Sequence, residues 1–144
     1  ITKKYSYIFN PWSNGERSYN AEPMAGLSFK AMKRAGEKDP LIRDRVEHLE
    51  HRSVEVFYDL KKDPHSTKNL LNSKESQSGY EKEISNLKDR MLEWMIEFKD
   101  PAINAYKNRQ SPESLEKFME QFTARARAEK DALVPYEKEK GYRF

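Results

Sequence analysis

The segment VEVFYDLKKDPHSTKNLL, residues 54–71, constrains the fold more than any other part of the chain. In its first half, apolar residues such as Val56 and Tyr58 alternate with residues that would point to the opposite face, and this period of two indicates a β-strand. Asp63 and Pro64 then predict a turn, because proline fixes φ and an aspartate carboxylate accepts hydrogen bonds from nearby backbone N–H groups. The segment therefore predicts a strand with one face buried and the other partly buried, followed by a chain reversal.

A second alternating run, YSYIF at residues 5–9, predicts another strand. It begins without a preceding cap or turn, so we expect this chain to be part of a longer protein. The Asn-, Pro-, Ser- and Gly-rich stretch at 10–20 predicts a loop.

Helical spacing of apolar residues predicts four helices. One covers 22–36 and ends at Gly36, and a second covers 39–52 with Asp39 as its N-cap and Pro40 at its first position. The clearest helix covers 80–98, with a capping box formed by Ser78 and Glu81. Its apolar stripe consists of Tyr80, Ile84, Leu87, Met91, Met95 and Phe98.

The fourth helix starts at Ser111 and is expected to lose its amphipathic pattern before Pro135. The polar tail that follows carries Tyr142 and Phe144, which could find a groove. The order of elements predicts an α+β fold: a small antiparallel β-sheet with packed α-helices, plus a helical C-terminal extension. We place the two parts at 1–101 and 102–144.

Composition excludes several classes of function. Hydrophobic residues make up 36% of the 144 positions and charged residues 35%, which predicts a thin core under a polar surface. The net charge of +3 is spread along the chain without a strongly basic block, so we expect no nucleic-acid partner. No apolar run is long enough to span a membrane, so we expect no membrane partner either. The absence of cysteine excludes disulfides, thiolate metal sites and a cysteine nucleophile within this chain.

The three histidines do not form a recognisable metal site. His48 and His51 are spaced i, i+3 between glutamates on the second predicted helix. A metal-binding pair is conceivable there, but we interpret this part of the helix as a solvated charged face. We predict no catalytic residue and no metal ligand in the chain.

The order of these motifs resembles the C-terminal subdomain of the sulfatase family, with heparan N-sulfatase-like (N-sulfoglucosamine sulfohydrolase-like) members closest in the loop at 10–32. The resemblance extends from residue 2 to 101 and includes TKKYSYIFN, the segment 54–71, YEKEISNLKDRMLEWM and a final Asp-Pro. Ser66 stands where the family usually has Glu. The matching positions of the signature are Tyr58, Asp59, Leu60, Asp63, Pro64, Asn69 and Leu70.

This resemblance implies a parent enzyme that hydrolyses sulfate esters or sulfamates, with sulfated glycans as its substrates. Such enzymes use calcium and a formylglycine made within a Cys/Ser-x-Pro/Ala-x-Arg motif, and no such motif occurs here. The implied partner is therefore an N-terminal catalytic domain of the same parent chain, which would be periplasmic or secreted. By itself this chain should be inert.

We interpret residues 58–70 as a joint, meaning a structural connection that reverses the chain after the strand and carries no functional site. The turn-forming properties of its residues account for each of them. The better candidate for substrate binding is the loop, since a Trp face packs on sugar C–H groups and an Arg fork pairs with sulfate. Its candidate residues are Asn10, Trp12, Arg17, Tyr19 and Asn20. A structural role for Trp12 in the core is the alternative at this position.

Two other functions stay open. A stand-alone protein-interaction module would use the helices at 80–98 and 112–132 as a hairpin with an apolar seam. An anion-binding module would use Lys3, Lys4, Lys30, Lys33 and Arg34. We also expect self-association, because the first strand would leave an open edge in KYSYIF.

Overall fold

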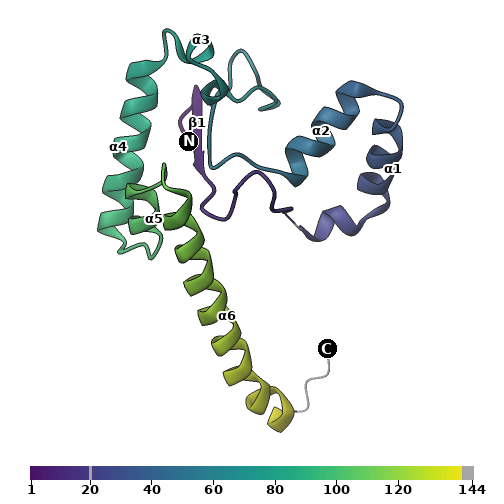
Figure 1. Ribbon diagram of the computed structural model, residues 1–144, viewed down its shortest axis with the longest axis vertical. Coiled ribbons are helices and arrows are strands. Elements are labelled where there is room, and N and C mark those ends of the chain that lie inside the picture. The colour runs from purple at the N-terminus through teal and green to yellow at the C-terminus, as the bar shows by residue number, and fades with distance from the viewer. Residues whose placement is uncertain (20, 141–144) are drawn as a thin grey trace.

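The computed structural model describes residues 1–19 and 21–140, with side chains described up to residue 132. Within these residues it has a two-stranded antiparallel sheet and a series of helices, which confirms the predicted α+β class (Figure 1). The elements are β1 (Tyr5–Phe9), η1 (Glu22–Ala25), α1 (Leu27–Gly36), α2 (Pro40–Glu50), β2 (Glu55–Asp59), η2 (Leu70–Asn72), α3 (Lys74–Gln77), α4 (Glu81–Glu97), α5 (Ile103–Lys107) and α6 (Pro112–Lys140).

The sheet pairs the two predicted strands with each other, so that Tyr7 lies opposite Phe57. Successive side chains of a strand point to opposite faces, and both faces of β2 are buried here. Val56 and Tyr58 are buried as predicted, and Phe57 on the other face has no exposed surface at all. The face that was expected to be partly buried is therefore the centre of the core.

Five buried side chains from four elements form this core: Tyr7, Phe57, Ile84, Met95 and Tyr106. Aromatic rings extend it, with ring centroids 5.5 Å apart for Tyr5 and Phe57 and 5.1 Å apart for Phe9 and Tyr106. The stripe predicted on α4 faces this cluster, except that Phe98 at its end is 60% exposed. Burial of large aromatic and aliphatic side chains from distant segments is what stabilises the sheet.

Helices α1 and α2 pack against each other as a hairpin (Figure 1). Asp39 caps α2 as predicted, because its Oδ1 accepts hydrogen bonds from the N–H groups of Leu41 at 2.9 Å and Ile42 at 3.4 Å. Gly36 ends α1 where the two helices meet. A Cβ atom at this position would lie 3.0 Å from the Cα of Arg43, so the close approach favours glycine.

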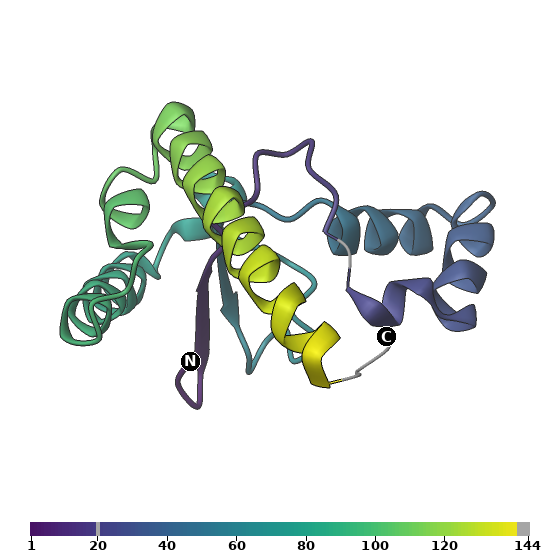
Figure 2. The same cartoon turned by 90° about the horizontal axis from the view of Figure 1, so that it is seen from below.

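Helix α5 packs against both α4 and α6. It brings Ala105 and Tyr106 into the core, and Leu115 in the first turn of α6 is also buried. Beyond that turn, α6 extends away from the sheet (Figures 1 and 2). Because α5 lies between them, α4 and α6 do not form the simple hairpin that an interaction module would use.

Two expectations about helix limits were wrong, and two features of the helices were not foreseen. The helix expected at 22–36 is divided into η1 and α1, because Gly26 has an extended backbone with ψ of 164°. Ser78 does not cap α4, whose N-cap is Tyr80, and the Glu81 carboxylate instead accepts a hydrogen bond from the N–H of Gly79. The sequence pattern gave no sign of the short helices α3 and α5. Helix α6 continues to Lys140, past Pro135.

Tyr142 and Phe144 lie outside the described residues. Among the helices of residues 1–19 and 21–140, none combines the length and apolar character needed to cross a membrane.

Candidate functional site

The predicted loop site is anchored to the start of β2. The Asn10 side-chain amide donates to the carbonyl of Ser53 at 2.8 Å, and its backbone N–H donates to Val54 at the same distance. Ser13, which is buried, donates its hydroxyl to the carbonyl of Arg52. Asn10 therefore holds the loop in place, and the structure gives it a positional role.

Trp12 and Tyr19 come together at the surface. Their rings stack with centroids 5.2 Å apart and an interplanar angle of 28°. Tyr19 is 43% exposed, and its backbone N–H donates to the carbonyl of Glu50 at 2.8 Å. The pair forms an aromatic platform outside the core, so the predicted core alternative for Trp12 is wrong. Asn20, the last candidate, falls outside the described residues.

Arg17 is directed toward α6. Its Nη2 donates to both carboxylate oxygens of Glu116 at 2.5 and 2.6 Å, and its Nη1 donates to the carbonyl of Trp12 at 3.3 Å. Both charged side chains are partly exposed, with exposed fractions of 32% and 50%. A sulfate group on a glycan would therefore compete with Glu116 for this guanidinium.

A cavity of about 310 Å³ lies between the loop, the start of β2 and the first turn of α6. Two guanidinium groups and two carboxylates border it, which leaves it close to neutral. Its polar lining comprises Ser13, Asn14, Arg17, Glu55, Arg109, Gln110 and Glu116.

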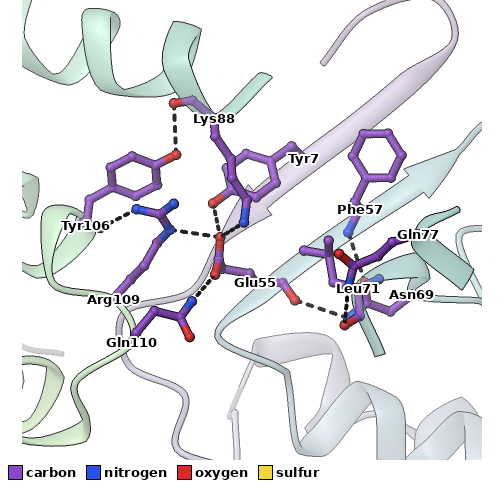
Figure 3. A network of polar contacts seen from close by, with 10 residues as sticks. All are labelled: Tyr7, Glu55, Phe57, Asn69, Leu71, Gln77, Lys88, Tyr106, Arg109 and Gln110. Carbon is purple, nitrogen blue, oxygen red and sulfur yellow. Dashed lines mark hydrogen bonds and ion pairs between the residues drawn. The ribbon is translucent and has the colours of Figure 1, made fainter. Parts of the chain in front are cut away.

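Glu55 is the centre of the main polar network of the core (Figure 3). Its carboxylate accepts from the Tyr7 hydroxyl at 2.6 Å and from Lys88 Nζ at 2.8 Å. Arg109 Nε and Gln110 Nε2 each donate to it at 2.9 Å. The four donors come from β1, α4 and the segment between α5 and α6, so one carboxylate joins the main parts of the core.

The electrostatics of this network favour a structural role. Burial by itself raises the pKa of Glu55, but hydrogen bonds from Lys88 and Tyr7 and the nearby positive charges outweigh it, so the pKa is lowered. Burial and the bond to Glu55 raise the pKa of Tyr7. Glu55 therefore stays ionised with its oxygen atoms occupied, and it is not placed to take a proton from a substrate.

The joint at 58–70 uses its polar side chains to hold backbone groups. Asp59 accepts from the N–H groups of Lys61 and Lys62 and from the Tyr80 hydroxyl. Asp63 accepts from the N–H groups of Thr67 and Lys68, which follow it by four and five residues. These contacts agree with a joint between β2 and α4.

Asn69 completes the joint from inside the protein. Its Oδ1 accepts from the N–H groups of Phe57 and Leu71 at 3.0 and 3.1 Å, and its Nδ2 donates to the carbonyl of Glu55 at 3.1 Å. The same Nδ2 donates to Asn72 at 3.0 Å. The buried side chain therefore substitutes for a neighbouring strand along the outer edge of β2 (Figure 3).

The histidine prediction needs a correction. His48 and His51 are half-buried rather than on a solvated face. His48 Nε2 lies 3.1 Å from the hydroxyl of Tyr58. Burial, followed by the charges of Arg52 and Arg45, lowers the pKa of His48. In the part of the chain that the structure describes, no three His, Asp or Glu side chains converge as a metal site.

Sequence reasoning missed Glu55 and its partners. The one available signal was its place beside Phe57 and Asp59 on the second face of the strand, since a carboxylate on a buried face must find donors. Lys88, Arg109 and Gln110 had no such signal.

Comparison of the chain with protein-family models, with curated proteins and with solved structures gives no match.

Proposed function

We propose that this chain is the C-terminal subdomain of a sulfatase-type enzyme that hydrolyses sulfate esters or sulfamates of glycans. In this proposal it is a scaffold without catalytic residues of its own. The observation that supports it is the segment between β2 and α4, where Asp59, Asp63 and Asn69 of the family signature each accept hydrogen bonds from backbone N–H groups. A sequence signature whose residues hold the backbone in this way would recur in a family because it stabilises the subdomain.

The chemistry would reside in the N-terminal catalytic domain, which would supply the formylglycine and the calcium ion. This chain would contribute the rim of the substrate cleft through its loop. Trp12 and Tyr19 provide a stacked, partly exposed surface for the C–H face of a sugar. Arg17 provides a planar fork that fits a sulfate, at the cost of its contact with Glu116.

An interaction module is the second candidate, and exposed aromatic side chains favour it. Trp94 and Phe98 at the end of α4 are 62% and 60% exposed, and Phe122 on α6 is also exposed. The anion-binding alternative has less support, because Lys33 pairs with Glu50 at 2.6 Å. Lys3 and Lys4 precede β1, at a distance from α1 in the views of Figures 1 and 2.

The first test is complementation. We expect the purified chain to show no turnover of an aryl sulfate, with or without calcium. The parent reading frame should encode an upstream Cys/Ser-x-Pro/Ala-x-Arg motif, and coexpression with that region should yield a stable, active complex. Turnover by the pure chain, or a parent reading frame without the motif, contradicts the proposal.

The second test measures glycan binding at the loop. The chain has two tryptophans, so a Trp94→Phe variant leaves Trp12 as the only indole emitter. We expect its emission to change on titration with heparan sulfate oligosaccharides and not with desulfated ones. Arg17→Ala should weaken binding, whereas Glu116→Gln should strengthen it by freeing the guanidinium. The matched Trp12→Phe variant, which reports from Trp94, should show no change; equal responses would contradict the loop site.

A further inference from the structure

The two outer edges of the sheet differ in how their backbone groups are satisfied. In an antiparallel pair, alternate residues direct their N–H and C=O groups toward the partner strand and away from it. Leu60 donates to Lys4 and Asn10 donates to Val54, so even-numbered residues of β1 face β2. Tyr5, Tyr7 and Phe9 therefore direct their backbone groups outward.

Several of the outward groups on the sheet already have partners. On β2, Asn69 bonds to Phe57 and Glu55, as described above. On β1, Thr2 accepts from the N–H of Tyr5 at 2.9 Å and donates its own N–H to the Tyr5 carbonyl at 2.8 Å. Within residues 1–19 and 21–140, the N–H and C=O groups of Tyr7 and Phe9 have no protein partner. These four groups make the middle of the β1 edge the longest run of outward groups without a protein partner on the described sheet.

Apolar surface adjoins this open edge. A groove of about 480 Å³ is lined by Ile1, Tyr7, Met91 and Trp94, of which Ile1 is 88% exposed. Arg90, Glu93 and Glu97 also line it, so the groove presents charges of both signs. The segment Tyr5–Phe9 contains neither lysine nor proline, the residues that commonly prevent a strand edge from pairing.

We propose that a second copy of this chain pairs with the β1 edge, so that two β1 strands run antiparallel and form a four-stranded sheet. A two-fold axis at Ile8 places Tyr7 opposite Phe9 of the second copy and satisfies both N–H and both C=O groups of each strand. In this arrangement each strand offers two N–H donors and two C=O acceptors to an identical strand, so the edge is complementary to itself. The groove carries charges of both signs and can therefore also face an identical groove. This inference concerns the 144-residue chain and does not depend on the proposed function.

The axis makes a specific prediction for Ile8. Residues that face each other between hydrogen-bonded pairs have Cβ atoms about 5 Å apart, so the two Ile8 side chains would touch. Ile8 is 41% exposed, so its replacement should leave the monomer folded.

The experiment is sedimentation velocity over micromolar concentrations with three variants. We expect the wild-type chain to shift from 17.1 kDa to twice that mass. Ile8→Lys and Ile8→Glu should each weaken the dimer by about tenfold or more, because like charges would meet at the axis. An equal mixture of the two variants should recover the dimer. Leu27→Lys, which adds the same charge at an exposed position on α1, should dimerise as the wild type does.

Hydrogen exchange gives an independent readout that needs no variant. The amides of Tyr7 and Phe9 should gain protection as the concentration of the chain rises, while those of α1 should not. A wild-type monomer at every concentration overturns the proposal. So does a dimer that both Ile8 variants retain, or one in which the Tyr7 and Phe9 amides stay unprotected.

Discussion

The sheet core and the α1–α2 hairpin bury their apolar side chains in different ways. In the core, buried residues come from segments far apart in the chain, from Tyr7 on β1 to Tyr106 on α5. In the hairpin, the buried apolar side chains are Phe29 and Val46, from two neighbouring helices. Stability that depends on distant segments is lost as a whole, whereas stability between neighbours can be lost locally.

Polar contacts follow the same division. Glu55 connects donors on three separate segments, and its side chain is only 10% exposed. The hairpin instead has Lys33 paired with Glu50, two partly exposed side chains on its own helices. Because water weakens exposed ion pairs, the second contact should add little to stability. The comparison teaches that the core and the hairpin should respond differently to matched substitutions.

The largest effect should come from Phe57→Ala. We expect it to lower the free energy of unfolding by about 3–5 kcal/mol, because a fully buried aromatic ring leaves a cavity in the core. The matched Phe29→Ala should instead expose residues 27–50 to hydrogen exchange while β1, β2 and α4 stay protected. Urea denaturation and exchange measured on both variants test this, and global unfolding caused by Phe29→Ala would show that the hairpin is part of the core.

The next effect should come from Glu55→Gln. We expect a loss of about 2–4 kcal/mol at neutral pH, because Lys88 and Arg109 would lose the charge that compensates their partial burial. The lowered pKa of Glu55 means that this stabilisation is present above the ordinary value of 4.5 and is lost as the pH falls through the folded-state value.

Urea denaturation of both proteins across the acid range checks this. The stability of the wild type should approach that of Glu55→Gln as the pH falls below 4.5. A difference that stays constant through the acid range would mean that the charge on Glu55 is not what stabilises the core. Glu47→Gln, an exposed carboxylate on α2, serves as the control.

The smallest effect should come from Gly36→Ala. A Cβ atom there meets the Arg43 backbone at 3.0 Å, and overpacking of this kind costs about 1–3 kcal/mol. The loss should appear as faster hydrogen exchange within the hairpin, without a change in the core. Lys30→Ala on the exposed side of α1 is the control. If the core amides also lose protection, the two regions are coupled more tightly than their contacts indicate.

The sequence by itself determined what depends on near neighbours. The alternation of residues 5–9 and 54–60 gave both strands, and Asp39 with Pro40 gave the start of α2, because strand periodicity and helix capping act within a few residues. The aromatic and cationic character of the loop marked Trp12, Arg17 and Tyr19. Local pattern also predicted the α4 stripe, apart from Phe98, whose exposure depends on where the core ends.

Only the tertiary structure decided which partners these residues have. Tyr7, Lys88 and Arg109 reach Glu55 from segments far apart in the sequence, and Arg17 reaches Glu116 on α6. Asn69 bonds to two backbone groups of the β2 edge in the same way, although its place in a loop suggested only a turn-forming role. A carboxylate or amide can be buried only when donors and acceptors arrive with the fold, and that arrangement depends on how the whole chain packs rather than on the residues beside it.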